Sequence, residues 1–142
     1  MSAMQISRAS DYGVRAMVHL AGLPGDIRAS LADLAASTEV PSAFLSKVLQ
    51  RLVKAGYVRS RRGHGGGFTI ACDSATISMF DLVVVFDGPL ALNACLLPGG
   101  CERSPRCVAH RVWIDAQARV REVLNTTTLA MLASQAPSPL QK

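Results

Sequence analysis

One helix-length segment, followed directly by a glycine- and arginine-rich hairpin, most narrows the folds open to this chain. From Ser42 to Ala55 apolar residues recur at helical spacing, and Gly56 follows as a typical helix-ending glycine. Ser42 is predicted to cap this helix. Beyond Gly56, two short β-prone runs flank the stretch Gly63-His64-Gly65-Gly66-Gly67, which predicts a hairpin. The predicted apolar face of the helix consists of Phe44, Leu45, Val48, Leu49, Leu52 and Val53.

Two shorter helical patterns precede this segment. The first runs from Asp11 to Leu23, with Ser10 or Asp11 expected as its N-terminal cap. The second begins after Ser30, and Asp33 stands three residues further on, close to a capping box. Helix, helix, turn, helix and hairpin is the order of a winged helix-turn-helix.

Three more helices are expected downstream, over Ile77 to Phe86, Val108 to about Leu124, and Thr127 to Ala133. The predicted fold is therefore mainly α with a small β-hairpin wing, a winged helix-turn-helix followed by a long C-terminal helix. The expected organisation is a winged helix-turn-helix region over 1–88, a cysteine-containing loop over 89–107, the long helix and a short terminal helix over 108–135, and a disordered tail over 136–142.

Length and charge favour a single domain with an acidic partner. The chain has 142 residues, of which 49% are hydrophobic, and a formal net charge of +5. A basic balance favours nucleic acid or anionic membranes as partners. No segment approaches the ~18 apolar residues of a membrane span, and Asp11 and Arg15 interrupt the N-terminal region where a signal peptide would be apolar. We therefore expect a cytoplasmic protein without a membrane partner.

Side chains for DNA binding concentrate on the third predicted helix and on the hairpin. In a winged helix-turn-helix the helix after the turn enters the major groove, and basic or short polar side chains contact phosphates and base edges. A solvated charged face is the alternative explanation. The glycine run does not end in Gly-Lys-Ser/Thr and opens no helix, so a nucleotide loop is not indicated. The candidate DNA-binding residues are Ser42, Ser46, Lys47, Gln50, Arg51, Arg59, Arg61, Arg62 and His64.

A second cluster of reactive side chains lies in the stretch ACLLPGGCERSPRCVAH. Cys95, Cys101 and Cys107 are six residues apart, and His110 follows the last by three. In a reducing compartment such clustering indicates metal or redox chemistry rather than disulfides. The gaps are wider than those of typical structural zinc sites, whereas three thiolates and one further ligand suffice for an iron–sulfur cluster. The spacing favours an iron–sulfur cluster, with zinc binding or thiol redox sensing as alternatives.

Four segments together resemble the bacterial Rrf2 family of winged-helix regulators. They are the opening Met4 to Tyr12, the stretch Phe44 to Leu52, the wing Arg61 to Phe68, and the cysteine loop, and the resemblance extends over roughly residues 4–133. It implies a homodimeric transcription factor, repressor or activator, that binds a double-stranded DNA operator and has no small-molecule substrate. The long helix would pair with its copy in the partner. No catalytic arrangement of residues is evident, so we expect no enzyme.

The resemblance also implies a cluster that reports on iron–sulfur supply, nitric oxide or redox state, and it offers two ligand sets. IscR-like members bind [2Fe–2S] with three cysteines and a histidine, which matches Cys95, Cys101, Cys107 and His110. NsrR-like members bind [4Fe–4S] with three cysteines and an aspartate from the first helix of the other subunit, a position matched by Asp11. We favour [2Fe–2S] and His110, because His110 is local to the loop. Asp11 has an alternative role as a helix cap.

Overall fold

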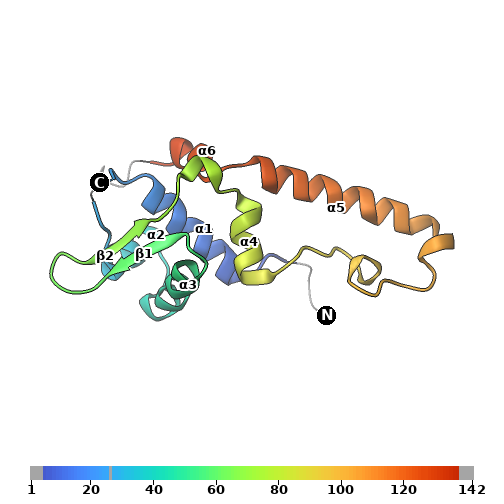
Figure 1. Ribbon diagram of the computed structural model, residues 1–142, viewed down its shortest axis with the longest axis horizontal. Helices are drawn as coiled ribbons and strands as arrows, with labels where there is room; N and C mark the ends of the chain where they lie inside the picture. Colours follow the sequence, from blue (N-terminus) through green and yellow to red (C-terminus); the bar gives the residue numbers. More distant parts are fainter. Residues whose placement is uncertain (1–4, 26, 138–142) are drawn as a thin grey trace.

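The computed structural model describes residues 5–25 and 27–137 and consists of a helical body with one long helix projecting from it (Figure 1). The tail beyond residue 137, predicted to be disordered, lies outside the described residues. The described part confirms the predicted class, because it is mainly helical with a two-stranded antiparallel hairpin. The elements are α1 (Arg8–Ala21), α2 (Leu31–Thr38), α3 (Ser42–Lys54), β1 (Val58–Arg61), β2 (Gly67–Ile70), η1 (Ser74–Thr76), α4 (Met79–Asp87), η2 (Ala94–Leu96), η3 (Ser104–Arg106), α5 (Val108–Thr126) and α6 (Leu129–Gln135).

The N-terminus of α1 differs from the prediction. The helix begins at Arg8, and the Ser7 side chain caps it by accepting a hydrogen bond from the Ser10 N–H at 3.2 Å. Ser10 is fully buried, and Asp11 instead forms an exposed ion pair with Arg15 at 2.9 Å. The expectation that Ser10 or Asp11 caps this helix is therefore wrong, because the chain becomes helical one turn earlier.

The ends of α2 and α3 follow the predicted pattern in part. Ser30 and Asp33 form the expected capping box at the start of α2. Ser42 is the first residue of α3 and does not cap it; Pro41 occupies the cap position, and no side chain there accepts a hydrogen bond. Gly56 adopts a φ of +90° just after α3, as expected of a glycine that ends a helix. The Ser42 hydroxyl is thus left outside the capping of its own helix.

The core lies where α1, α2 and α3 meet. Leu45, Val48, Leu49 and Leu52 of α3 are buried, as the periodicity predicts. Two residues assigned to the same face are not: Phe44 is 48% exposed and Val53 is 36% exposed. The buried stripe of α3 is therefore narrower than predicted, and the other faces of this helix are open to a partner. The remaining core residues are Ala16, Met17, Leu20, Ala29, Leu34, Val40, Val58, Ile77, Leu82 and Leu129.

The C-terminal end of α4 is fastened to the start of α1. The Asp87 carboxylate accepts hydrogen bonds from the Ser10 hydroxyl at 2.7 Å and the Ser7 N–H at 3.1 Å. Burial acts to raise the pKa of Asp87, but the hydrogen bonds from Ser7 and Ser10 and the nearby Arg51 charge hold this pKa below its usual value. The charged form of Asp87 therefore stabilises the junction of α1 and α4.

Replacing Ser10 with alanine is expected to lower the free energy of unfolding by about 1 kcal/mol at neutral pH, since one hydrogen bond to a carboxylate is lost. Because the folded-state pKa of Asp87 is depressed, its contribution is present above the unfolded pKa and is lost as pH falls through the folded pKa. Urea unfolding at neutral and acidic pH should show the gap between wild type and variant narrowing in acid. Exposed Ser37→Ala is the control and should leave stability unchanged; an equal gap at both pH values would contradict the prediction.

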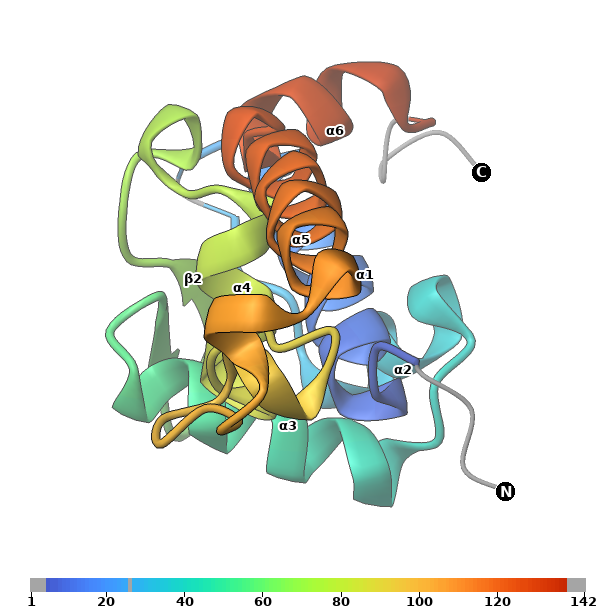
Figure 2. The same ribbon diagram turned by 90° about the vertical axis from the view of Figure 1, so that its right-hand side faces the viewer.

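The long helix α5 projects from the body, and α6 returns to it (Figures 1 and 2). The backbone around Ser78 pairs with that around Thr128, so the base of α4 and the start of α6 are joined. Leu129 of α6 is buried in the core. None of the helices in the described part of the chain combines the length and hydropathy that a membrane span requires.

Candidate nucleic-acid interface and cysteine loop

A groove between α3 and the wing brings together several of the predicted DNA-binding residues. It has a volume of about 320 Å³. Ser46 and Gln50 line it from α3, and Arg61 and Arg62 line it from the wing. The two elements follow each other in the chain and line one shared hollow. Val53, Ser60, Gly67 and Phe68 complete the lining.

The wing needs a glycine at the start of β2 in order to lie where it does. The strands pair from Val58 with Ile70 to Arg61 with Gly67. Gly67 has a φ of +143°, and a Cβ there would lie 2.6 Å from the carbonyl oxygen of Ala29. Ala29 itself pairs with Phe68 through backbone hydrogen bonds of 2.8 and 3.1 Å. The wing is therefore docked against the linker between α1 and α2, and a side chain at Gly67 would prevent this docking.

Arg28 is a basic residue at this surface that the sequence reasoning missed. Its guanidinium donates to the Gly65 carbonyl at 3.2 Å, so it supports the glycine tip. A second hollow, of about 520 Å³, has Arg28, Arg59 and Arg61 among its lining residues. A single arginine in a linker has no sequence pattern of its own, and only the fold places it beside the wing.

The other candidate residues occupy different surroundings. Ser42, Lys47 and His64 are exposed, the first two on α3 and the last at the wing tip. Arg51 does not line the groove. Its guanidinium donates to the Val85 carbonyl of α4 at 2.6 Å. Within the described residues, the Arg51 side chain is thus held by another element of the protein, although it is exposed.

Arg62→Ala is expected to weaken operator binding and to reduce the slope of log K against log salt by about 0.9 for each protomer bound, because one phosphate contact releases about one counterion. Arg62 is exposed on the wing and lines the groove. The slope is measured by titrating DNA at several salt concentrations. Arg111→Ala removes an exposed arginine of α5 instead and should leave the slope unchanged. A wild-type slope for Arg62→Ala would mean that this side chain contacts no phosphate.

The cysteine loop connects α4 to α5 and contains the short turns η2 and η3. All of its thiols are free; Cys95 is half-buried, whereas Cys101 and Cys107 are exposed. Cys107 is the cap residue of α5, and the His110 N–H donates to its carbonyl at 3.2 Å. Cys107 and His110 therefore lie within one turn of each other at the start of the long helix.

The loop does not present an assembled metal site. Among the described residues, no group of three or more His, Cys, Asp or Glu side chains is arranged to hold a metal ion. The chemistry of the donors nevertheless fits an iron–sulfur cluster, which takes thiolates and accepts imidazole. The Nδ1 atom of His110 is buried and lacks a hydrogen-bond partner within the described residues, which is unusual for a buried polar atom. His110 thus has an unused ligand atom at the start of α5, next in sequence to a loop with three free thiols.

Asp11, the alternative ligand, lies on α1 and not in the loop. Its carboxylate is exposed and holds Arg15 at 2.9 Å. An exposed pair of this kind contributes at most about 1 kcal/mol. It nevertheless gives Asp11 a local partner within its own chain, whereas Nδ1 of His110 has none among the described residues.

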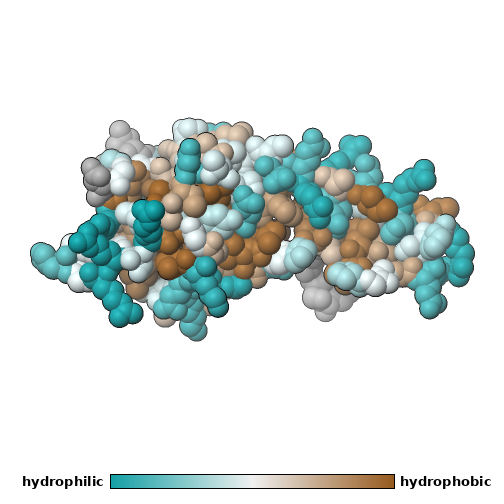
Figure 3. Space-filling view, viewed as in Figure 1, coloured by the Kyte–Doolittle hydropathy of each residue, from teal (hydrophilic) through white to brown (hydrophobic). Residues whose placement is uncertain are grey.

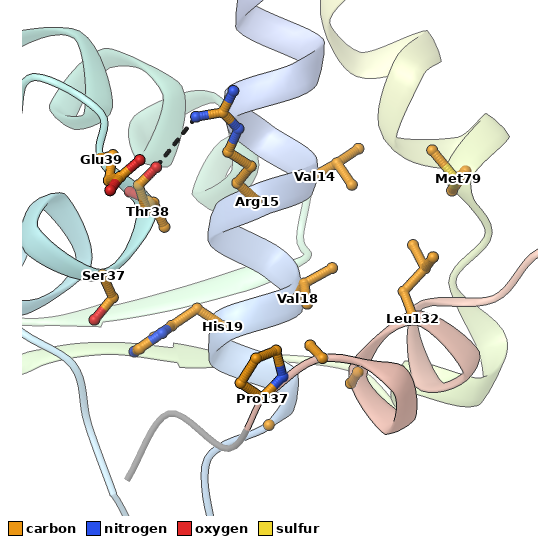
Figure 4. A pocket seen from close by; sticks show the side chains of 13 residues that line it. Val14, Arg15, Val18, His19, Ser37, Thr38, Glu39, Met79, Leu132 and Pro137 are labelled. Carbon is orange, nitrogen blue, oxygen red and sulfur yellow. Dashed lines mark hydrogen bonds between the residues drawn. The ribbon is translucent and has the colours of Figure 1, made fainter. Parts of the chain in front are cut away.

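A pocket of about 760 Å³ lies between α1, the end of α2 and α6 (Figure 4). Val14 and Val18 of α1 face Leu132 of α6 across it (Figure 4). At its polar edge Arg15 donates to the Thr38 carbonyl at 3.2 Å. None of the predicted DNA-binding or metal-binding residues is among its described lining residues. The pocket is thus separate from both candidate sites.

Three packed helices, a wing docked beside the third of them and a shared groove between the two define a winged helix-turn-helix DNA-binding protein. The profile of the Rrf2 family, described as "Iron-dependent Transcriptional regulator", matches residues 6–135. The chain therefore belongs to the Rrf2 family. It is a DNA-binding transcription regulator, which confirms the resemblance seen in the sequence and the expectation that the protein is not an enzyme.

Similar proteins support this assignment. The HTH-type transcriptional regulator IscR of Vibrio vulnificus is 31% identical over 131 residues, which are 92% of this chain and 78% of that protein. The structure of CymR, the global cysteine regulator of B. subtilis, has a TM-score of 0.80 at 30% identity and covers 95% of this chain and 100% of its own. T. potens IscR has a TM-score of 0.76 at 28% identity, over 99% of this chain and 93% of its own.

Proposed function

We propose that this regulator is a homodimer that senses iron–sulfur status, nitric oxide or redox state through an iron–sulfur cluster. The ligands are Cys95, Cys101, Cys107 and His110, with [2Fe–2S] favoured over [4Fe–4S]. The observation that supports this most is the buried Nδ1 of His110, which has no hydrogen-bond partner among the described residues and belongs to the first turn of α5, directly after a loop with three free thiols. The family description as iron-dependent and the similarity to IscR proteins agree with it.

The fourth ligand is assigned to His110 rather than to Asp11 of the partner subunit. Asp11 is engaged with Arg15 in its own chain. An imidazole is also a better match than a carboxylate for iron bound to sulfide and thiolate, and it raises the reduction potential relative to a fourth thiolate. We therefore expect the regulator to respond to a change in the cluster that the cysteine loop holds.

When bound, the cluster would supply a centre that gains or loses electrons and reacts with nitric oxide; everything else is performed by the chain itself. In this proposal Ser46 and Gln50, which line the groove from α3, contact base edges. Arg61 and Arg62, which line the groove from the wing, contact phosphates. The polypeptide that leaves α4 and enters α5 links this DNA-binding surface to the loop.

The homodimer is proposed from the surface of α5. None of its residues is buried in the protomer, and Val112 and Val123 are 62% and 64% exposed. At helical spacing they form one stripe with Ala116 and Val120. Hydrophobic side chains reach the surface along this arm (Figure 3). A second copy of α5 packed on the stripe would remove it from water, which is the main driving force for such pairing.

The alternative is a regulator without a cluster, in which the cysteines bind zinc or act as thiol redox sensors. The exposure of Cys101 and Cys107 favours this second candidate, because accessible thiols are open to oxidation. Both candidates keep the same DNA-binding surface and differ only in what occupies the loop.

Purification without oxygen, followed by iron, zinc and acid-labile sulfide analysis and visible absorption, tests the proposal. Equal iron and sulfide near two per chain support the [2Fe–2S] cluster and His110. Values near four of each shift the assignment to [4Fe–4S] and to Asp11 of the partner subunit. Zinc without sulfide, or no metal, would overturn the cluster and favour the alternative.

A further inference from the structure

We propose that Arg51 is a positioning residue that fastens the recognition helix α3 to the C-terminal end of α4, where the cysteine loop begins, and that it is not a DNA contact. This revises its assignment from the sequence. The inference rests on the proposed function only where it treats the loop as a sensor.

Two contacts hold the Arg51 guanidinium against neighbouring residues of α4, and its charge acts on a third. It donates to the Val85 carbonyl at 2.6 Å. Its Cζ lies 5.0 Å from the centre of the Phe86 ring, a cation–π distance. Its charge also acts on the Asp87 carboxylate. A side chain that reached away to DNA would give up both contacts.

The end of α4 needs this partner. The last carbonyls of a helix have no donor within the helix itself. Here the Gly88 N–H satisfies Val84 at 3.0 Å, and Arg51 satisfies Val85. Removing the guanidinium therefore leaves the Val85 carbonyl without a protein donor in the described structure and loosens the last turn of α4.

The same turn is packed against α1. The Phe86 ring occupies the space above Gly13, where even a Cβ would collide with it. Asp87 is bound by Ser7 and Ser10. Arg51 thus joins α3 to the last turn of α4, which is itself packed against α1. The orientation of α3 therefore depends on the position of this turn.

The cysteine loop starts directly after the last turn of α4. Gly88, with a φ of +73°, ends α4, and Cys95 follows within the next turn-rich segment. On its other side the loop is attached to α5, where the Leu92 N–H donates to Gln117 at 2.9 Å. A rearrangement of the thiols is therefore passed along a short covalent connection to Asp87 and Phe86, and through Arg51 to α3.

The first test separates a positioning role from a DNA contact. Operator affinity is measured against salt for wild type, Arg51→Met, Arg51→Lys and Arg62→Ala, with circular dichroism to check folding. A positioning residue leaves the salt slope of Arg51→Met at the wild-type value, whereas Arg62→Ala lowers its slope by about 0.9 for each protomer bound. A comparable fall for Arg51→Met would overturn the inference. Arg51→Lys keeps the charge and should keep the wild-type slope; if Arg51→Met does not fold, Arg51→Gln, which also removes the charge, takes its place.

The second test measures the connection to the loop. Operator affinity is measured for cluster-loaded and cluster-free protein, and the ratio of the two affinities is compared between wild type and Arg51→Met. In Arg51→Met this ratio is expected to be closer to one than in wild type by a factor of at least about five, which is within the usual range of coupling between sites. Iron content and visible spectrum should stay at wild-type levels. An unchanged ratio would overturn the inference.

If cluster-loaded and cluster-free wild type bound the operator equally well, this result would contradict the proposed sensing function. It would not contradict the contact between α3 and α4 through Arg51. In that case hydrogen exchange decides. Peptides that cover 82–92 should exchange faster in cluster-free Arg51→Met than in cluster-free wild type, because the Val85 contact is lost. Equal exchange in both proteins would show that Arg51 does not hold the end of α4, and would overturn the inference.

Discussion

Cys101→Ala is expected to remove the visible absorption of protein purified without oxygen and to lower its iron content more than about tenfold. A cluster held by three thiolates and one imidazole loses a covalent ligand in this variant. The fold should survive, because Cys101 is exposed and lies outside the core. Iron and sulfide analysis, the absorption spectrum and far-UV circular dichroism are compared with those of wild type.

The matched control is Cys72→Ala. Cys72 is also an exposed free thiol, but it follows the wing and donates to the Gly56 carbonyl at 3.3 Å. This variant should keep the full iron content and spectrum. Cys95→Ala and Cys107→Ala should behave like Cys101→Ala. If all three loop variants kept the spectrum of wild type, the cluster would be bound elsewhere and the assignment of the loop would fail.

Local pattern was sufficient to predict the recognition helix and the wing. The periodicity of α3 and the glycine run after it are local properties, and Ser30 and Asp33 predict the start of α2 in the same way. The start of α1 was harder, because Ser7 and Ser10 are both serines able to cap. Which of them does so depends on Asp87, 77 residues away from Ser10, to which the Ser10 hydroxyl donates.

The parts of the candidate site that escaped prediction all depend on distant contacts. Arg51 looks like any basic residue on a polar helix face until α4 places Val85 beside it. Arg28 acquires its role only because the wing tip folds back to it. Cysteine spacing likewise identifies donors but not their distances, since a loop rich in glycine and proline has many conformations with the same spacing.

Val112→Glu is expected to convert the protein to a monomer and to weaken binding to a two-half-site operator by about 100-fold or more, because linked half-sites gain that much from simultaneous binding. The side chain is 62% exposed in the protomer, on the apolar stripe with Val120 and Val123. A charge there would be buried without a partner between two copies of α5, which is strongly unfavourable. Light scattering after gel filtration measures the mass, and DNA titration measures the affinity.

Ala118→Glu is the matched control, since it places the same charge on the same helix at an exposed position. At 100° per residue, Ala118 lies on the side of α5 opposite the stripe that contains Val112. Its mass and affinity should equal those of wild type. A dimeric Val112→Glu protein would show that α5 is not the interface. A monomer that kept full operator affinity would show that pairing is not what places the two recognition helices on DNA. Only loss of both in one variant and of neither in the other supports the proposed dimer.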